Sequence, residues 1–208
     1  MANNFRNGKL IYHLTSLENL ASILQNGLLS RKILFTAQGN FADIADDRIL
    51  NKRAGFSLDE YVPFHFSYKS AFDAAVQKDY PDTNFIYICV HRDTAKNQGF
   101  EIITRHPINI FTKTGQVDIL SYDEGINQIE WDIMEQDNYL DQDVKEVRMA
   151  ECLIKDCVPV EWFQSILVKD EATQTLVNNL LTHVKLPYGK KIFCNISPYC
   201  FRHYPKAS

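Results

Sequence analysis

Lys9-Leu-Ile-Tyr-His13-Leu-Thr15-Ser-Leu-Glu18 is the most informative stretch of the sequence. Residues 9–14 are mostly apolar or aromatic and predict a short strand. Thr15 and Glu18 have the spacing of a capping box, in which Thr15 caps a helix and Glu18 reaches back to it. The predicted helix has one apolar face and Gly27 at its expected left-handed end. We therefore expect His13 at the end of a strand, immediately before a helix.

The rest of the chain alternates less regularly between strand-like and helix-like segments. Strands are predicted over residues 61–67, 85–90, 100–103, 150–154, 165–169 and 191–196. Helices are predicted over residues 69–79, 126–136, 143–149 and 170–183. The apolar run 85–90 is expected to be a central strand buried on both faces. Because there is no steady strand–helix–strand rhythm, we predict an α+β fold with mostly antiparallel strands.

The composition is that of one folded domain spanning residues 1–208. The chain has 208 residues, of which 45% are hydrophobic and 23% charged, and its longest apolar run is far too short to cross a bilayer. We expect a cytoplasmic protein with no membrane contact. The five cysteines, with no secretory signal, predict reduced thiols. A net charge of -4 excludes a global positive field, so any nucleic-acid contact requires a local basic patch.

Several familiar sites are absent from the sequence. There is neither a P-loop motif nor the glycine fingerprint of a Rossmann dinucleotide site. Cys194, Cys200 and His203 are spaced too loosely for a typical zinc site, and we expect no metal. No local signature of a Ser or Cys nucleophile is present, so a scattered triad stays open but unsupported.

The remaining candidates are His13, Arg53, His106 and Glu151. Each has an ordinary interpretation: His13 as a half-buried histidine bonded to backbone, Arg53 as a solvated loop charge, and His106 as part of a turn. Glu151 is different, because it begins an apolar strand where a carboxylate is desolvated. Such a group requires a partner or a role.

With their flanking residues, these candidates resemble the DarT family of DNA-modifying ADP-ribosyltransferase toxins. The matching segments run in the family's order: 11–15 with Asn19 and 26–28, then 52–55, 59–66 with Ser70, 103–106, 128–131, and Ala150-Glu151 leading into an apolar strand. The resemblance implies an ADP-ribosyltransferase-like fold, with two small, mostly antiparallel sheets and surrounding helices enclosing an NAD cleft. It also explains the missing Rossmann motif, because that fold binds NAD without it.

The resemblance further implies transfer of ADP-ribose from NAD+ to a thymidine or guanosine base in single-stranded DNA, with release of nicotinamide. NAD+ is then a substrate, and a DarG-type macrodomain antitoxin is the expected partner. Segments 29–54, 66–70 and 79–85 depart from the thymidine-modifying members, which leaves the acceptor base open. Two alternatives also remain: the same fold modifying RNA or protein, and a non-catalytic nucleic-acid-binding module.

Site residues follow from the same resemblance. Glu151 would be catalytic, stabilising the positive charge that develops on the ribose, and Arg53 would stabilise a base losing its proton and anchor phosphate. NAD binding would involve Arg53 together with His13, Thr15, Asn19, Gly27 and Tyr61. Substrate binding would fall to Lys52, Tyr68, Ser70, Arg105 and His106. Tyr68 could stack on a base and the cations could follow the DNA backbone, although core packing and a solvated surface are the ordinary interpretations.

Overall fold

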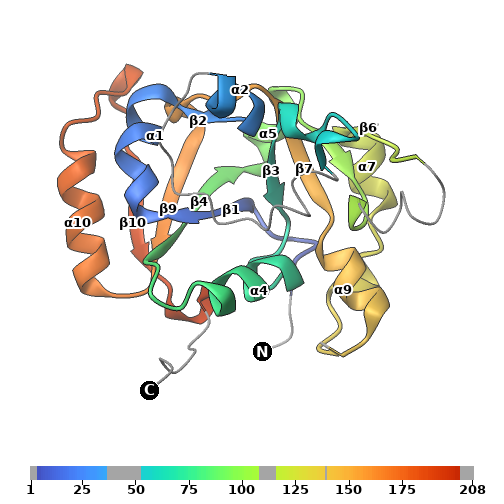
Figure 1. Ribbon diagram of the computed structural model, residues 1–208. Helices are drawn as coiled ribbons and strands as arrows, with labels where there is room; N and C mark the ends of the chain where they lie inside the picture. The colour runs from blue at the N-terminus through green and yellow to red at the C-terminus, as the bar shows by residue number, and fades with distance from the viewer. Residues whose placement is uncertain (1–3, 37–52, 108–115, 139, 202–208) are drawn as a thin grey trace.

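The structure is a computed structural model that describes residues 4–36, 53–107, 116–138 and 140–201 (Figure 1). Its strands are β1 Leu10–Ser16, β2 Leu28–Leu29, β3 Tyr61–His65, β4 Phe85–His91, β5 Glu101–Ile103, β6 Leu120–Ser121, β7 Glu151–Lys155, β8 Cys157–Val158, β9 Phe163–Val168 and β10 Phe193–Ile196. Its α-helices are α1 Leu20–Asn26, α2 Arg31–Thr36, α4 Ala71–Asp79, α5 Arg92–Asn97, α7 Tyr122–Gln128, α8 Trp131–Met134, α9 Gln142–Arg148 and α10 Glu171–Leu181. Short 3-10 helices cover Leu17–Asn19, Leu58–Glu60, Val160–Trp162, Pro187–Gly189 and Pro198–Cys200.

The strands form an eight-stranded sheet in the order β10-β9-β4-β1-β3-β7-β5-β6, and β2 pairs with β8 in a separate two-stranded sheet. Strand β10 is parallel to β9, and the other neighbours in the large sheet are antiparallel. The predicted α+β class with mostly antiparallel strands is confirmed. The expectation of two small sheets is wrong, because a pairing between β1 and β3 joins the two halves into one sheet.

This junction is narrow. Strand β1 pairs with β4 along its whole length, from Leu10 opposite His91 to Ser16 opposite Phe85. Between β1 and β3, by contrast, the only register pair among the described residues is Tyr12 opposite His65. The two halves of the sheet therefore separate on leaving this single bridge.

The first strand is longer than predicted and the helix cap is different. Thr15 is part of β1, and its hydroxyl accepts a hydrogen bond from Asn19 Nδ2 at 3.2 Å. The cap is Ser16, whose Oγ accepts from the Glu18 backbone N–H at 3.3 Å. Because β4 offers pairing partners as far as Ser16, the strand continues beyond His13. His13 therefore lies in the middle of β1 and not at its end.

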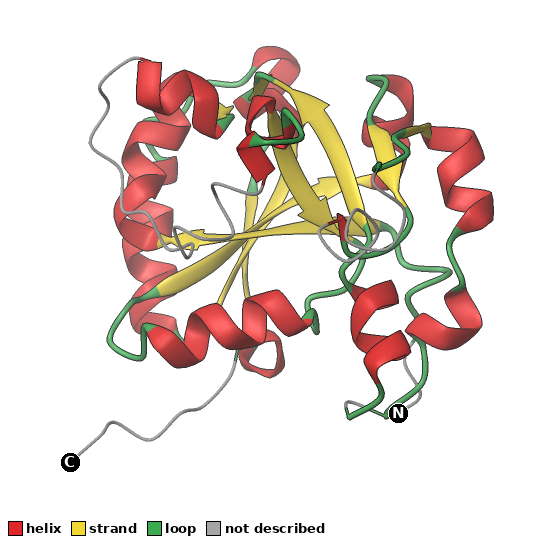
Figure 2. Cartoon of the chain, turned by 45° about the vertical axis from the view of Figure 1, so that its right-hand side comes forward, coloured by secondary structure: helices red, strands yellow, loops and turns green. Residues whose placement is uncertain are grey.

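Helices cover both faces of the large sheet (Figures 1 and 2). On one face, α1 and α10 lie side by side and bury an apolar cluster of Leu20, Ile86, Ile166, Val168 and Val177. On the other face, α4 and the C-terminal segment cover Leu14, Val76, Phe85, Tyr87, Cys89, Leu167 and Cys200. Strand β4 lies between β1 and β9 with Phe85 to Val90 buried, which confirms the predicted central strand.

The helices before β7 fix the position of its first residue. The helix predicted over 126–136 is two short helices, α7 and α8, because the buried Ile129 between them is extended. Helix α9 ends at Arg148, which is 1% exposed and donates from Nε to the Met134 carbonyl at 2.9 Å. Since β7 begins at Glu151, this buried arginine anchors the chain just ahead of that residue.

The described part of the chain holds no helix that is both long and apolar enough to cross a membrane. All five cysteines are free thiols, and Cys89, Cys152 and Cys200 are buried.

Candidate active site

Arg53 and Glu151 form a buried, two-pronged ion pair. Arg53 Nη1 lies 2.6 Å from Glu151 Oε1, and Nη2 lies 3.0 Å from Oε2. The side chains are only 15% and 6% exposed. Planar guanidinium and carboxylate groups match in this geometry, which strengthens both hydrogen bonds. The carboxylate at the head of β7 thus has the partner that its burial requires.

Opposing effects act on the Glu151 carboxyl. Burial favours the neutral form and raises its pKa, whereas the charge and hydrogen bonds of Arg53 lower it. His65 and His106 lower the pKa further. Together these neighbours outweigh burial, so the pKa of Glu151 lies below its ordinary value. The site therefore holds a dry carboxylate in its charged form.

His65 was not among the residues singled out from the sequence, yet the fold places it beside Glu151. The two residues are directly paired across β3 and β7, so their side chains share one face of the sheet. His65 is 8% exposed, and its Nδ1 lies 3.2 Å from the carbonyl oxygen of Ala150. The available signal was a histidine at an alternating position in an otherwise aromatic and apolar strand.

His13 lies where the two halves of the sheet separate. Its Nδ1 donates to the Pro63 carbonyl oxygen at 2.7 Å, and its ring is 5.5 Å from that of Phe64. Burial lowers the pKa of His13 to about 4, even though the Pro63 bond opposes this change. The imidazole is therefore neutral near pH 7, with the Nδ1 proton fixed by Pro63 and Nε2 left as the acceptor nitrogen.

His106 is the other predicted residue near Glu151, since its charge contributes to the lowered pKa of that carboxyl. Its backbone N–H donates to the Glu146 carbonyl oxygen at 2.9 Å, which ties its loop to α9. The structure therefore gathers His106 with Arg53, Glu151 and the unpredicted His65.

Other predicted NAD-binding residues have structural roles in this fold. Thr15 and Asn19 bond to each other at the end of β1. Gly27 ends α1 with φ 82°, and a Cβ there would come within 2.6 Å of Cys157 Sγ. Tyr61 pairs with Lys155, at the end of β3 and β7 away from Glu151, and the Lys155 ammonium lies 5.3 Å from its ring. Their roles in NAD binding stay predictions.

The predicted substrate-binding residues are also engaged within the protein. Tyr68 packs edge-on against Phe5, Tyr12 and Tyr199. Ser70 caps α4, accepting from the Asp73 N–H at 2.9 Å. Lys52 lies outside the described residues.

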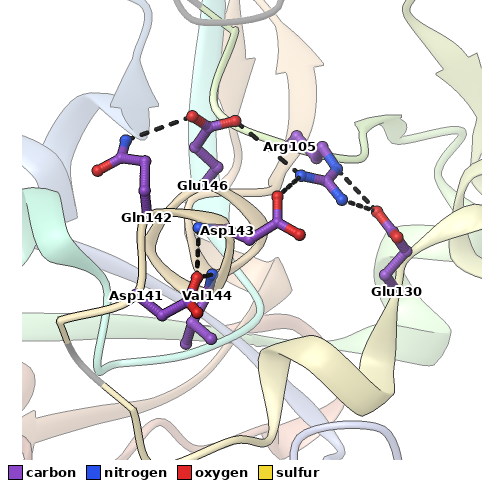
Figure 3. A network of polar contacts seen from close by, with 7 residues as sticks. All are labelled: Arg105, Glu130, Asp141, Gln142, Asp143, Val144 and Glu146. Atoms are coloured by element: carbon purple, nitrogen blue, oxygen red, sulfur yellow. Dashed lines mark hydrogen bonds and ion pairs between the residues drawn. The ribbon is translucent and has the colours of Figure 1, made fainter.

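Arg105 is the centre of an acidic network (Figure 3). Its guanidinium contacts Glu130 and, through Nη1, Asp143 Oδ1 at 2.6 Å. Glu146 Oε2 lies 4.0 Å from the same nitrogen. This network connects the loop that carries His106 to α9, the helix that leads into Glu151.

In the residues that the structure describes, no group of three or more His, Cys, Asp or Glu side chains is arranged to hold a metal ion. Cys194 and Cys200 are free thiols, and His203 lies outside the described part of the chain.

Comparisons with known proteins agree on one family. The sequence model described as "DarT: ssDNA thymidine ADP-ribosyltransferase, DarT" matches residues 12–197. No curated protein sequence matches the chain significantly.

Solved structures show the same fold. Thermus sp. 2.9 DarT in complex with ADP-ribosylated ssDNA has a TM-score of 0.77 at 18% identity, over 97% of this chain and 100% of that one. The same protein in complex with NAD+ has a TM-score of 0.72 at 17% identity, over 94% and 98%. Thermosipho africanus DarTG in complex with ADP-ribose has a TM-score of 0.67 at 19% identity, over 93% of this chain and 51% of that one.

Proposed function

The chain belongs to the DarT family of single-stranded-DNA thymidine ADP-ribosyltransferases, and from this premise we propose how its own residues carry out the transfer. It is an NAD-dependent transferase that modifies single-stranded DNA. The sequence left thymidine and guanosine open as acceptors, and the family match favours thymidine. The buried Arg53–Glu151 pair is the observation that supports the proposed site.

Glu151 acts at the ribose of NAD+. When the bond between nicotinamide and C1′ of the ribose breaks, nicotinamide leaves with the bonding electrons and positive charge develops on the sugar. A fixed carboxylate in a dry site stabilises that charge more than water would. A nitrogen of the acceptor base then forms the new bond to C1′, and its proton passes to the Glu151 carboxylate, which acts as the general base.

Arg53 has two tasks. In the ligand-free site it keeps Glu151 ionised despite burial. During transfer its permanent charge stabilises an acceptor base that is losing its proton, and its donors suit phosphate oxygens. A lysine carries the same charge without the fork of donors that matches both carboxylate oxygens.

His13 contributes a hydrogen-bond acceptor of fixed orientation. Because its Nδ1 is held by Pro63, the neutral ring presents Nε2 as an acceptor for a ribose hydroxyl of NAD+. Its position at the separation of β1 from β3 agrees with a site between the two halves of the sheet.

Single-stranded DNA suits this chemistry because the reacting edge of a base is hidden in a duplex. The acidic chain must capture DNA through local cations, so we expect weak, salt-sensitive binding. The similarity to Thermosipho africanus DarTG supports a DarG-type macrodomain antitoxin as the partner of this toxin.

The test is incubation of the protein with NAD+ and four single-stranded oligonucleotides, each lacking one base, followed by mass analysis. We expect one ADP-ribose adduct on every oligonucleotide except the one without thymine, with equal release of nicotinamide. The Glu151→Gln variant should bind NAD+ but transfer at least about 100-fold more slowly.

Other results would redirect the proposal. Loss of the adduct only without guanine would identify guanosine as the acceptor. Label found on RNA or protein but not on DNA would favour the same fold with another acceptor. Absence of thermal stabilisation at saturating NAD+ would indicate a non-catalytic module, because a ligand that binds the folded state must raise the melting temperature.

A further inference from the structure

His65 lies at the junction of the two halves of the sheet. Among the described residues it alone pairs with both neighbouring strands at this point, with Tyr12 of β1 on one side and Glu151 of β7 on the other. His65 therefore links the junction directly to Glu151. Its side chain lies on the same face of the sheet as the catalytic carboxylate.

The imidazole is held by backbone next to Glu151. Its Nδ1 lies 3.2 Å from the Ala150 carbonyl oxygen, so Nδ1 carries a proton and donates it there. Ala150 immediately precedes Glu151, and both are buried. The bond thus fixes the peptide from which the carboxylate projects.

Charged groups face His65 from several elements. Glu151 lies on β7, paired with Arg53, and Asp73 lies on α4 beside Phe72, whose ring is 6.3 Å from the imidazole. His65 lowers the pKa of Glu151 and opposes the burial that raises the pKa of Asp73, which shows its closeness to each. Further titratable groups near this cluster are Tyr12, which pairs with His65, and His13 on β1, together with His106.

Asp73 itself is buried, and among the described residues its carboxyl group is hydrogen-bonded to Tyr87 and not to an active-site residue. It is 2% exposed, and Tyr87 Oη donates to its Oδ2 at 3.1 Å. Burial raises the pKa of Asp73, although His65 and the hydrogen bonds of Ser70 and Tyr87 oppose this change. The imidazole thus lies between two buried carboxyl groups, one of which is Glu151.

We propose that His65 is a positioning residue for Glu151, holding its backbone through Ala150 and placing an imidazole beside its carboxylate while Arg53 engages substrate. The inference rests on the proposed function and names a residue that acts through Glu151. Its two parts, the hydrogen bond and the effect of the imidazole on the Glu151 carboxylate, are separable by substitution.

His65→Phe keeps an aromatic ring but removes both the donor and the imidazole that lowers the pKa of Glu151. We expect kcat to fall by about tenfold or more, with the KM for NAD+ changed by less than about threefold, because in this proposal His65 acts through Glu151 and not on NAD+. The acid limb of kcat should move to higher pH, since Glu151 protonates more easily without this neighbour.

His65→Asn separates the two parts, because its amide nitrogen can replace Nδ1 as the donor to Ala150 without ever carrying charge. It should recover most of kcat on the plateau, yet its acid limb should stay displaced. His183→Gln, in the exposed turn after α10, is the matched control and should leave both quantities unchanged.

The proposal is overturned if His65→Phe turns over within about threefold of wild type. It is also overturned if both variants lose activity equally at every pH, which is the behaviour of a purely structural residue. The melting temperature and the calorimetric NAD+ affinity identify a folding defect in His65→Phe. In that case the pH profile of His65→Asn distinguishes a positioning role from a purely structural one. A Glu151→Gln variant that stays active would instead contradict the proposed function.

Discussion

His13 of β1 donates from Nδ1 to the carbonyl oxygen of Pro63 in β3 at 2.7 Å. The bond is made just beyond the bridge between Tyr12 and His65, where regular pairing between the strands stops. A side chain thus replaces a backbone hydrogen bond at the separation of the sheet. Proline suits the position because it has no N–H to satisfy and its carbonyl is free to accept.

This arrangement predicts a loss of stability in acid. The pKa of His13 is about 4 in the folded protein and 6.5 ordinarily, so the unfolded chain takes up the proton first as the pH falls. The contribution of neutral His13 to the free energy of unfolding is complete above about pH 6.5. It is lost as the pH falls toward 4, at up to about 1.4 kcal/mol per pH unit. Urea unfolding of wild type and His13→Asn between these values measures it. Asn can donate to Pro63 without titrating, so its pH slope should be smaller, and equal slopes would contradict the assignment.

Gly27 is predicted to be irreplaceable for reasons of packing. It has φ 82°, and a Cβ would lie 2.6 Å from Cys157 Sγ and 3.0 Å from the Val158 carbonyl oxygen. Gly27→Ala should therefore lower the free energy of unfolding by about 2–4 kcal/mol, through backbone strain together with overpacking. Chemical denaturation provides the measurement.

Gly99 is the matched control for Gly27. Its φ is 71°, but nothing lies within 4 Å of an added Cβ. Gly99→Ala should cost only the strain, about 1–2 kcal/mol. If the two variants lose the same stability, the close approach of α1 to β8 is not what requires Gly27.

Local patterns allowed much of the fold to be predicted. Apolar patterning predicted the first strand and helix, although Ser16 and not Thr15 is the cap, and the apolar run at 85–90 predicted the central strand. Glu151 was recognised because a carboxylate before Cys-Leu-Ile is conspicuous. Each of these signals lies within a few residues of the feature that it predicts.

Long-range geometry could not be predicted in this way. The bonds between Arg53 and Glu151 join residues 98 apart, and the bridge between Tyr12 and His65 depends on how the β1–β4 and β3–β7 strand pairs meet. Ser70 shows the opposite case. Its cap on the N–H of Asp73 depends on a local spacing that is visible in the sequence, whereas its role in substrate binding stays a prediction.

Arg105 is expected to stabilise the fold more than it binds DNA. Its 24% exposed side chain is held between Glu130 and Asp143, so Arg105→Gln should cost about 1 kcal/mol, and less at high salt. A lost phosphate contact would reduce the log–log salt slope of single-stranded DNA binding by about 0.7. We expect no such reduction, because the guanidinium already has carboxylate partners.

Arg6→Gln supplies the comparison for Arg105. Arg6 Nη2 lies 2.8 Å from Asp132, but these side chains are 50% and 89% exposed. Its loss should therefore change stability by less than about 0.5 kcal/mol. A full drop in the salt slope for Arg105→Gln alone would instead support the sequence-based prediction that Arg105 contacts the substrate.

The Arg53–Glu151 pair yields the largest expected effect on stability. Arg53→Ala leaves a buried carboxylate without its partner and should cost about 3–5 kcal/mol near neutral pH. Adding Glu151→Gln removes the orphaned charge, so the double variant should be more stable than Arg53→Ala alone.

The same pair predicts a dependence on pH. In wild type the pKa of Glu151 is lowered, and the contribution of Glu151 to the free energy of unfolding is present above pH 4.5 and lost as the pH falls further. In Arg53→Ala burial acts unopposed by Arg53 and the pKa rises, so part of the deficit should disappear on acidification. Urea denaturation of the four proteins at two pH values measures both effects, and a double variant whose loss of stability equals the sum of the two single losses would show that the pair contributes nothing beyond its separate side chains.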